Sequence, residues 1–245
     1  MTEVLLNHFY VTPDRATYDA AERGGFLQGF GALEKRTTVR RDTSYTGLYL
    51  YGEHTYLELL HPDSASFGAP SGIAYGVETP GGVAQVCQQL RAAKLEEVSR
   101  GDVPWFRSCR PEQLHGLAEW VMEYVPAFFR GFHPELPPRE PGITRSDALT
   151  RYAASCGKLR ERAAGLFEDV TGLEIALGKR EAELWNARTV RVGDADIRVS
   201  AAAEGSRTGI LAARLRLRSD AGSSVQQIGS TTLSLDGRSA VWRFQ

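Results

Sequence analysis

Two glutamates and one histidine stand in the middle of apolar segments, where ionisable side chains are uncommon. His8 lies within LLNHFYV, Glu58 within TYLELLHP and Glu123 within WVMEYVP. An ionised carboxylate is costly to bury on an apolar face unless a cation, a network of donors or open water meets it. Glu58 and Glu123 are therefore candidate catalytic groups, and either could accept a proton from a substrate.

The alternation of side chains along a strand predicts which residues share a face with these groups. In LLNHFYV it places Leu6, His8 and Tyr10 on one side, and in TYLELLHP it places Tyr56 beside Glu58. Whether His8 and Glu58 belong to one site is the question that this pattern raises. The alternative is that His8 is an ordinary buried histidine, hydrogen-bonded to a neighbouring strand or to Tyr10.

Aromatic residues accompany the candidate groups along the same segments. Tyr10, Tyr56, Tyr75 and Trp105 would line a pocket for a planar or partly apolar small molecule. Aromatic side chains at strand spacing are also typical of a plain core, and this alternative stays open for all four.

The chain repeats one plan of elements before residue 127. Residues 5–60 predict a strand, a helix after Thr12-Pro13, and then further strands; residues 71–125 predict the same order, with the helix starting at Thr79-Pro80. Glu123 holds the place in the second unit that Glu58 holds in the first, on the side of its strand opposite to Trp120. The repetition indicates two βαβββ-like units in tandem.

A proline-rich stretch, HPELPPREPGITRSD, follows the two units. It predicts a linker over 134–143 between an N-terminal domain, residues 1–133, and a C-terminal part, residues 144–245. The C-terminal part is expected to begin with helix over 144–170. It then continues as antiparallel strands, the last two joined by an Asp236-Gly237 turn. A degenerate further module pair is the alternative for this part.

Composition and net charge indicate which classes of binding partner to expect. The chain has 245 residues, 42% of them hydrophobic, which is enough for a real core. Its 29 basic and 30 acidic residues give a net charge of −1, so we expect neither nucleic acid nor anionic lipid as a partner. We find no basic leader and no apolar run near the roughly 20 residues that span a bilayer. A small-molecule ligand and a monomer or homodimer are expected.

Three cysteines, Cys87, Cys109 and Cys156, are odd in number and widely spaced. This spacing fits neither a disulfide framework nor a paired thiolate zinc site. We therefore expect reduced, structural cysteines and a cytoplasmic location.

The order and spacing of NHFYV, TYLELLHP, GIAYGVET and WVMEYVP resemble the vicinal oxygen chelate superfamily of glyoxalases, extradiol dioxygenases and bleomycin-resistance proteins. The resemblance covers about residues 4–127. More narrowly, NHFYV with SYTGLYLYGEHTYLELL looks like an uncharacterised bacterial glyoxalase-like family. The implied fold is α+β, with tandem βαβββ modules forming a cupped mixed sheet around a small-molecule or metal site.

The resemblance also implies a set of metal ligands. Sites in this superfamily take a histidine from the first strand of a module and a glutamate from its last, which matches His8 and Glu58, with Glu123 from the second module. A divalent ion, Fe, Mn, Zn, Ni or Mg, is the expected cofactor. The second histidine of the family pattern is missing, because Gly72 stands there, or Tyr75 if the Thr-Pro pairs set the register.

Two functions follow from this pattern. The first is a glyoxalase-like, metal-dependent isomerase, lyase or oxygenase acting on a small organic molecule in the cup of the N-terminal domain. The alternative is a metal-free protein that binds or sequesters a small molecule, as in the resistance branch. The missing histidine favours the second function, and the two mid-strand glutamates favour the first.

Overall fold

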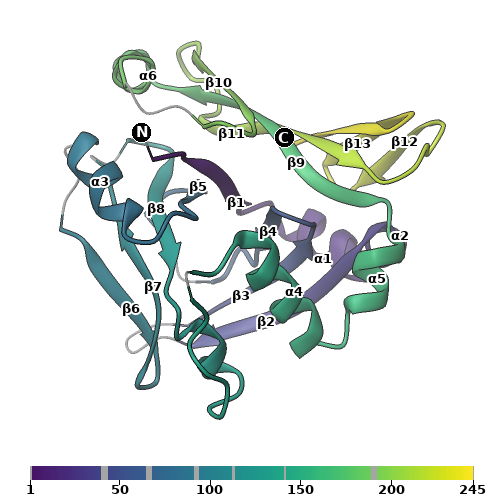
Figure 1. Ribbon diagram of the computed structural model, residues 1–245. Coiled ribbons are helices and arrows are strands. Elements are labelled where there is room, and N and C mark those ends of the chain that lie inside the picture. The colour runs from purple at the N-terminus through teal and green to yellow at the C-terminus, as the bar shows by residue number, and fades with distance from the viewer. Residues whose placement is uncertain are drawn as a thin grey trace.

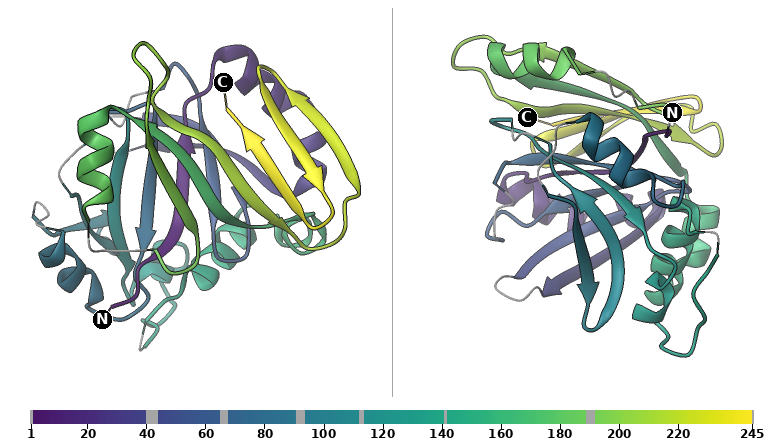
Figure 2. Two further views of the ribbon diagram at one scale, coloured as in Figure 1. Left: turned by 90° about the horizontal axis from the view of Figure 1, so that it is seen from above. Right: turned by 60° about the vertical axis from the view of Figure 1, so that its left-hand side comes forward.

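The computed structural model describes residues 2–39, 44–64, 68–90, 94–111, 114–140, 142–188 and 192–244. It is an α+β protein built on two sheets (Figures 1 and 2). Figure 1 shows the strands of the eight-stranded sheet curling so that β2 with β3 and β6 with β7 bend away from the six-stranded sheet. We call the side enclosed by this curl the concave face and the other side the convex face.

The eight-stranded sheet contains the first eight strands of the chain. The elements up to residue 60 are β1 (Leu5–Val11), α1 (Arg15–Arg23), α2 (Phe26–Phe30), β2 (Ala32–Val39), β3 (Ser44–Tyr51) and β4 (Tyr56–Leu60). The next are β5 (Ser71–Gly76), α3 (Gly82–Gln89), β6 (Glu96–Arg100), β7 (Val103–Cys109) and β8 (Ala118–Tyr124). The strand order is β2-β3-β4-β1-β5-β8-β7-β6.

The pairing around the centre of this sheet is what positions the candidate residues. β1 runs parallel to β4 and antiparallel to β5, and β5 runs parallel to β8. Every residue of β1 is buried, as expected for a central strand with packing on both faces. Side chains that alternate along β1 therefore enter two different environments.

The second sheet follows a pair of helices. The remaining elements are η1 (Phe128–Gly131), α4 (Arg145–Ser155), α5 (Leu159–Ala164), β9 (Phe167–Leu177), α6 (Lys179–Asn186), β10 (Asp196–Ala201), β11 (Gly209–Leu217), β12 (Ser223–Ile228), β13 (Thr231–Asp236) and β14 (Ser239–Arg243). The strand order is β10-β9-β11-β14-β13-β12. Gly237 has a φ of 57°, so the expected turn between β13 and β14 is confirmed.

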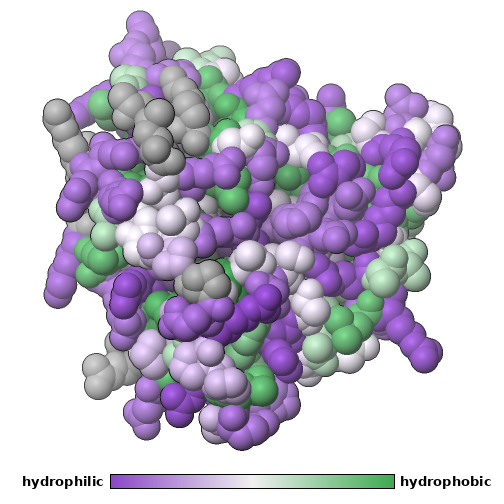
Figure 3. Space-filling model, viewed as in Figure 1, coloured by the Kyte–Doolittle hydropathy of each residue, from purple (hydrophilic) through white to green (hydrophobic). Residues whose placement is uncertain are grey.

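The two faces of the eight-stranded sheet carry separate cores. The convex face packs against the six-stranded sheet, α1 and α3 through aliphatic and aromatic residues such as Phe9, Leu57, Val121, Ile175 and Trp242. The concave face carries a tyrosine-rich core with Tyr49, Tyr56, Tyr124, Phe128 and Tyr152. Figure 3 shows one face of the exterior, on which hydrophobic residues form small separate groups among hydrophilic ones.

Helix α4 packs with the N-terminal sheet and not with the C-terminal one. Its residues Ala148, Leu149 and Tyr152 belong to the concave core, and its N-terminal Arg145 pairs with Glu78 at 3.0 Å and Asp194 at 2.6 Å. The C-terminal part predicted for 144–245 is thus divided in space, and strand β9 begins within the stretch expected to be helical. The proline-rich residues 134–140 are largely exposed.

A buried aspartate ties the two sheets together. Asp169 on β9 is 3% exposed and accepts hydrogen bonds from the backbone amides of His54 and Thr55, at 2.7 and 2.9 Å. The Thr55 hydroxyl and the Arg216 guanidinium donate to the same carboxylate at 3.1 and 2.9 Å. Charge-assisted bonds of this kind offset the cost of burying the carboxylate, and they fix the turn before β4 against the second sheet.

The expectation for the cysteines is wrong for two of them. Cys87 on α3 and Cys109 at the end of β7 form a disulfide, whereas Cys156 is a free thiol. Sequence spacing could not reveal this pair because 22 residues separate the partners and the fold alone brings them together. Disulfides are typical of oxidising compartments, so the pair counts against the predicted cytoplasmic location, which stays a prediction.

None of the helices within the described ranges is long and apolar enough to span a bilayer.

We predict that Asp169→Asn lowers the free energy of unfolding by about 2 to 4 kcal/mol, since an amide nitrogen would then face donors in a buried setting. Urea denaturation followed by circular dichroism measures the change. Glu174→Gln is the control, because Glu174 is 43% exposed and 3.6 Å from Arg214, and exposed pairs contribute less than about 1 kcal/mol. Equal losses in both variants would contradict the assignment.

We also predict that alkylation of the folded, unreduced protein modifies Cys156 alone, and that non-reducing peptide mapping links Cys87 to Cys109. Reduction should lower the free energy of unfolding by about 3 kcal/mol, the value expected for a loop of this length. Cys156→Ser should leave that difference unchanged. Alkylation of all three thiols before reduction would rule the disulfide out.

Candidate functional site

A β-bulge in β1 decides which residues face the concave side. The register with β5 shifts between Leu6 and His8, so that Leu6 pairs with Tyr75 and His8 with Ala74. The bulge sends Leu6 to the convex core together with Phe9, whereas His8 and Tyr10 face the concave side. The prediction that Leu6, His8 and Tyr10 share one face is therefore wrong for Leu6.

His8 and Glu58 lie side by side at the floor of the concave face. Their strands, β1 and β4, are parallel neighbours with Tyr10 opposite Glu58, and the His8 Nε2 and Glu58 Oε1 atoms are 3.6 Å apart. The side chains are only 7% and 9% exposed. The strand pattern thus correctly placed these two residues together, while their roles stay a prediction.

Asn7 selects the tautomer of His8. Its Oδ1 atom lies 2.8 Å from His8 Nδ1, and an amide oxygen can only accept, so Nδ1 carries the proton. Burial, with a smaller contribution from the Arg36 charge, lowers the pKa of His8 to about 3. At neutral pH the imidazole is therefore uncharged and presents the lone pair of Nε2 toward the Glu58 carboxylate.

Aromatic rings enclose this pair. The His8 ring stacks on Tyr56 with centroids 4.2 Å apart and meets the edge of Trp120 at 5.3 Å. Trp120 also stacks with Tyr10 at 6.2 Å, and the Tyr10 hydroxyl donates to the Ala69 carbonyl. Burial raises the pKa values of Tyr10 and Tyr56 above the ordinary value, so both are neutral donors.

Trp105, another of the four expected pocket residues, also lies on the concave face, next to Phe132 and Tyr152. It is half-buried, stacks with Phe132 at 5.6 Å and meets Tyr152 edge-on at 6.3 Å. Arg36 reaches the same region from β2, with its guanidinium 4.0 Å from the Tyr49 ring centroid. The concave face therefore extends from the His8 and Glu58 pair to an aromatic wall with a cationic group.

Glu123 does not join His8 and Glu58. Its two carboxylate oxygens accept from the backbone amides of Gly81 and Val83, at 2.7 and 3.0 Å. These amides open helix α3 on the convex side, where a carboxylate satisfies otherwise unpaired N–H groups and complements the helix dipole. The structure thus separates Glu123 from the pair with which it was expected to hold a metal ion and act in catalysis.

Tyr75 is also on the convex side, so its placement in the expected pocket is wrong. Its hydroxyl donates to Glu119 Oε1 at 2.7 Å, and Trp185 Nε1 donates to the same oxygen at 3.0 Å. Arg188 Nη1 pairs with Glu119 Oε2 at 2.6 Å. The Tyr75 ring lines a different cavity, which lies between the two sheets.

Among the residues that the structure describes, the side chains around His8 and Glu58 do not complete a metal site. The residues of β5 beside them on the concave face are Gly72 and Ala74, which offer no ligand. A Cβ atom at Gly72 would lie 2.4 Å from the Tyr10 ring, so the position that carries histidine in the family pattern has no room for one. Within the described ranges no three His, Cys, Asp or Glu side chains come together as a metal site would require.

Sequence reasoning missed three residues of this site, namely Asn7, Arg36 and Trp120. Asn7 adjoins the candidate histidine, and the polar neighbour of a buried imidazole could have been examined as its orienting group. Trp120 lies on the opposite side of β8 from Glu123 and reaches the concave face. It was missed because only the glutamate of this strand was considered as a site residue. Arg36 comes from a segment whose strand pattern is too polar to stand out.

Comparison with known families gives one clear result. A model described as "Family of unknown function (DUF5829)" matches residues 6–244. The chain belongs to this family. No curated protein matches this chain. The matched residues span both sheets.

The depressed pKa of His8 predicts a specific pH dependence of stability. In the unfolded chain His8 is protonated below about pH 6.5, whereas in the folded protein it is protonated only below about pH 3. Between these pH values the unfolded state binds more protons, so the free energy of unfolding falls as the pH falls below about 6.5. Wild-type protein should lose about 2 kcal/mol more than His8→Gln between pH 7 and pH 5, measured by urea denaturation. Parallel pH profiles for the two proteins would show that His8 is not buried in the neutral form.

Proposed function

We propose that this protein binds a small, partly aromatic organic molecule on the concave face, without a resident metal ion. The ligand presents an N–H donor or an ammonium group to His8 and Glu58. The observation that carries the proposal is the orientation of this pair, in which an imidazole lone pair and a carboxylate are 3.6 Å apart among aromatic rings.

Two neighbouring acceptors, one of them anionic, are complementary to a donor and most of all to a cationic donor. The face of Tyr56 and the edge of Trp120 adjoin the pair, and aromatic rings stabilise a nearby ammonium group further. Small-molecule sites typically combine such a mostly apolar, aromatic lining with a few oriented polar groups. The half-buried Tyr45, Trp105, Phe106 and Trp120 would contact the body of the ligand.

The arrangement of elements supports a relation to the vicinal oxygen chelate superfamily. The order β1-α1-α2-β2-β3-β4 is followed by β5-α3-β6-β7-β8, and the first strands of the two units pair at the centre of the sheet. We infer that these units are two βαβββ modules, the first carrying an extra short helix. On this view the second module has kept the fold and lost the ligand positions.

The competing proposal is the metal-dependent enzyme. Two ligands at about 2.1 Å from a tetrahedral ion lie roughly 3.4 Å apart, close to the separation of His8 Nε2 and Glu58 Oε1. A metal ion held there would have two protein ligands, fewer than the three that catalytic zinc sites usually supply. The donor set thus fits metal-free binding better than a resident ion.

Naphthalene probes that differ only in their polar group test the proposal. 1-Naphthylmethylamine should bind at least about tenfold more tightly than 1-naphthoate, as measured by calorimetry and by quenching of tryptophan fluorescence. Glu58→Gln should weaken binding of the amine by about tenfold or more, because shape is kept and the charge is removed. The matched control is Glu123→Gln, the same substitution on the convex side, which should leave the affinity unchanged.

Stronger binding of the naphthoate, or equal effects of the two substitutions, would contradict the proposed site. Titration of the protein with Mn, Fe, Ni, Zn and Mg, compared with His8→Ala, distinguishes the competing function. A rise in melting temperature with one of these ions in wild type, absent from His8→Ala, would favour the metal-dependent enzyme.

A further inference from the structure

The interface between the two sheets contains a cavity, on the side of the eight-stranded sheet opposite to His8 and Glu58. Its volume is about 280 Å³, slightly below the usual range of small-molecule sites, which begins near 300 Å³. Tyr75 and Val121 supply one wall from the eight-stranded sheet. Trp185, Arg188 and Ile197 supply the facing wall from α6, the segment after it and β10.

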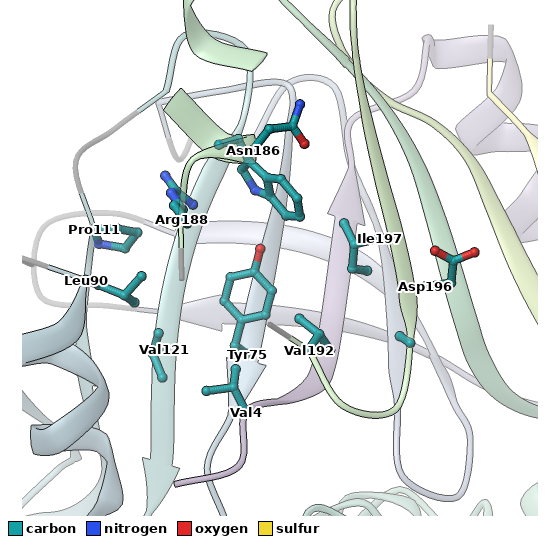
Figure 4. Close-up of a pocket in the computed structure, with 12 residues that line it drawn as sticks. Val4, Tyr75, Leu90, Pro111, Val121, Asn186, Arg188, Val192, Asp196 and Ile197 are labelled. Carbon is teal, nitrogen blue, oxygen red and sulfur yellow. The ribbon is translucent and has the colours of Figure 1, made fainter. Parts of the chain in front are cut away.

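A buried ion pair forms the polar end of this cavity. The Glu119 side chain is 2% exposed, and Tyr75, Trp185 and Arg188 donate to its two oxygens. Tyr75 comes from the eight-stranded sheet, whereas Trp185 and Arg188 come from α6 and the segment after it. The Glu119 carboxylate therefore links the two walls of the cavity. Figure 4 shows the Tyr75 hydroxyl directed toward the end of the cavity at which Arg188 and Asn186 lie, with Leu90 and Pro111 on one side and Ile197 on the other.

The chemistry of the lining selects the ligand. The Glu119 charge is matched by Arg188, and Asp196, which also lines the cavity, pairs with Arg198 and Arg214. Neither carboxylate therefore needs a cationic ligand to balance its charge. Arg188 has five N–H groups, and the contact with Glu119 uses Nη1, which leaves donors on the same guanidinium for an acceptor oxygen. The rest of the lining is mostly aliphatic and aromatic, with Val4, Leu90, Val192 and Ala195 among its residues.

We infer that this cavity binds a compact apolar molecule carrying one acceptor oxygen, a carbonyl or a carboxylate, which Arg188 recognises. The volume suits a single ring with one substituent. Such a ligand differs in polarity from the one proposed for the concave face, where the protein supplies acceptors and the ligand supplies the donor. The two sites are therefore separable by experiment.

Three probes with the same ring test the inference on the full-length protein, namely benzamide, benzoate and benzylamine. Benzamide, benzoate or both should bind saturably by calorimetry and ligand-observed NMR, with a dissociation constant below about 10 mM. In Glu58→Gln, which lacks the acceptor proposed for an ammonium group on the concave face, they should bind at least about tenfold more tightly than benzylamine. Binding of benzamide alone would identify a neutral carbonyl ligand, and tighter binding of benzoate a carboxylate ligand.

Variants place the binding in the cavity. Ala195→Phe fills the space and should weaken binding by at least about tenfold, whereas Ala203→Phe, the same substitution at an exposed position, should not. Arg188→Lys keeps the charge opposite Glu119 but loses the planar fork, so the affinity for the acceptor probes should fall several-fold. Melting curves of each variant check that it is folded.

Glu58→Gln separates this inference from the proposed function, because it should leave benzamide and benzoate binding unchanged. Absence of saturable binding by either acceptor probe would overturn the inference. So would equal binding by wild type and Ala195→Phe, or loss of binding in Glu58→Gln. Binding of benzylamine to Glu58→Gln as tight as that of the acceptor probes would overturn the role assigned to Arg188.

Discussion

The bulge in the central strand β1 is the constraint on which the arrangement of both faces depends. Every residue of β1 is buried, so a side chain that does not enter one core must enter the other. With the register shifted between Leu6 and His8, Leu6 joins the aliphatic core under the second sheet, and His8 joins the aromatic concave face. Strict alternation would put an aliphatic and an imidazole side chain on the same face, and the pair with Glu58 would stand in different surroundings.

Three buried glutamates in the eight-stranded sheet show how one residue type serves different purposes. Glu123 is satisfied by two amides at the start of α3, and Glu119 by three donors shared between the layers. Glu58 lies beside a neutral histidine. The first two carboxylates mainly organise the fold, because each connects elements that are far apart in the chain. The third lies among aromatic rings on the concave face, which makes it the strongest candidate for ligand recognition.

The two faces of the eight-stranded sheet also carry oriented polar groups of opposite kind. On the concave face the oriented polar groups are acceptors, His8 Nε2 and the Glu58 carboxylate. Between the sheets the oriented group is the Arg188 guanidinium, held by Glu119. Strands β5 and β8 contribute residues to both surfaces, since Tyr75 and Val121 line the cavity between the sheets and Ala74 and Trp120 face the concave side.

Local patterns in the sequence determined what depends on neighbours along the chain. The alternation in β4 placed Glu58 beside Tyr56, the alternation in β8 placed Glu123 opposite Trp120, and Asp236-Gly237 specified the last hairpin. The sequence also identified His8 as a candidate site residue.

Tertiary structure alone decided what depends on the second layer and on register. Both faces of the central strands are apolar, so no local pattern tells which face will be concave, and Glu123 and Tyr75 were placed on the wrong one. The bulge at the start of β1, the disulfide from Cys87 to Cys109 and the packing of α4 on the first sheet arise from contacts between segments distant in the chain. Such contacts depend on the packing of whole layers, so residue spacing within one segment cannot predict them.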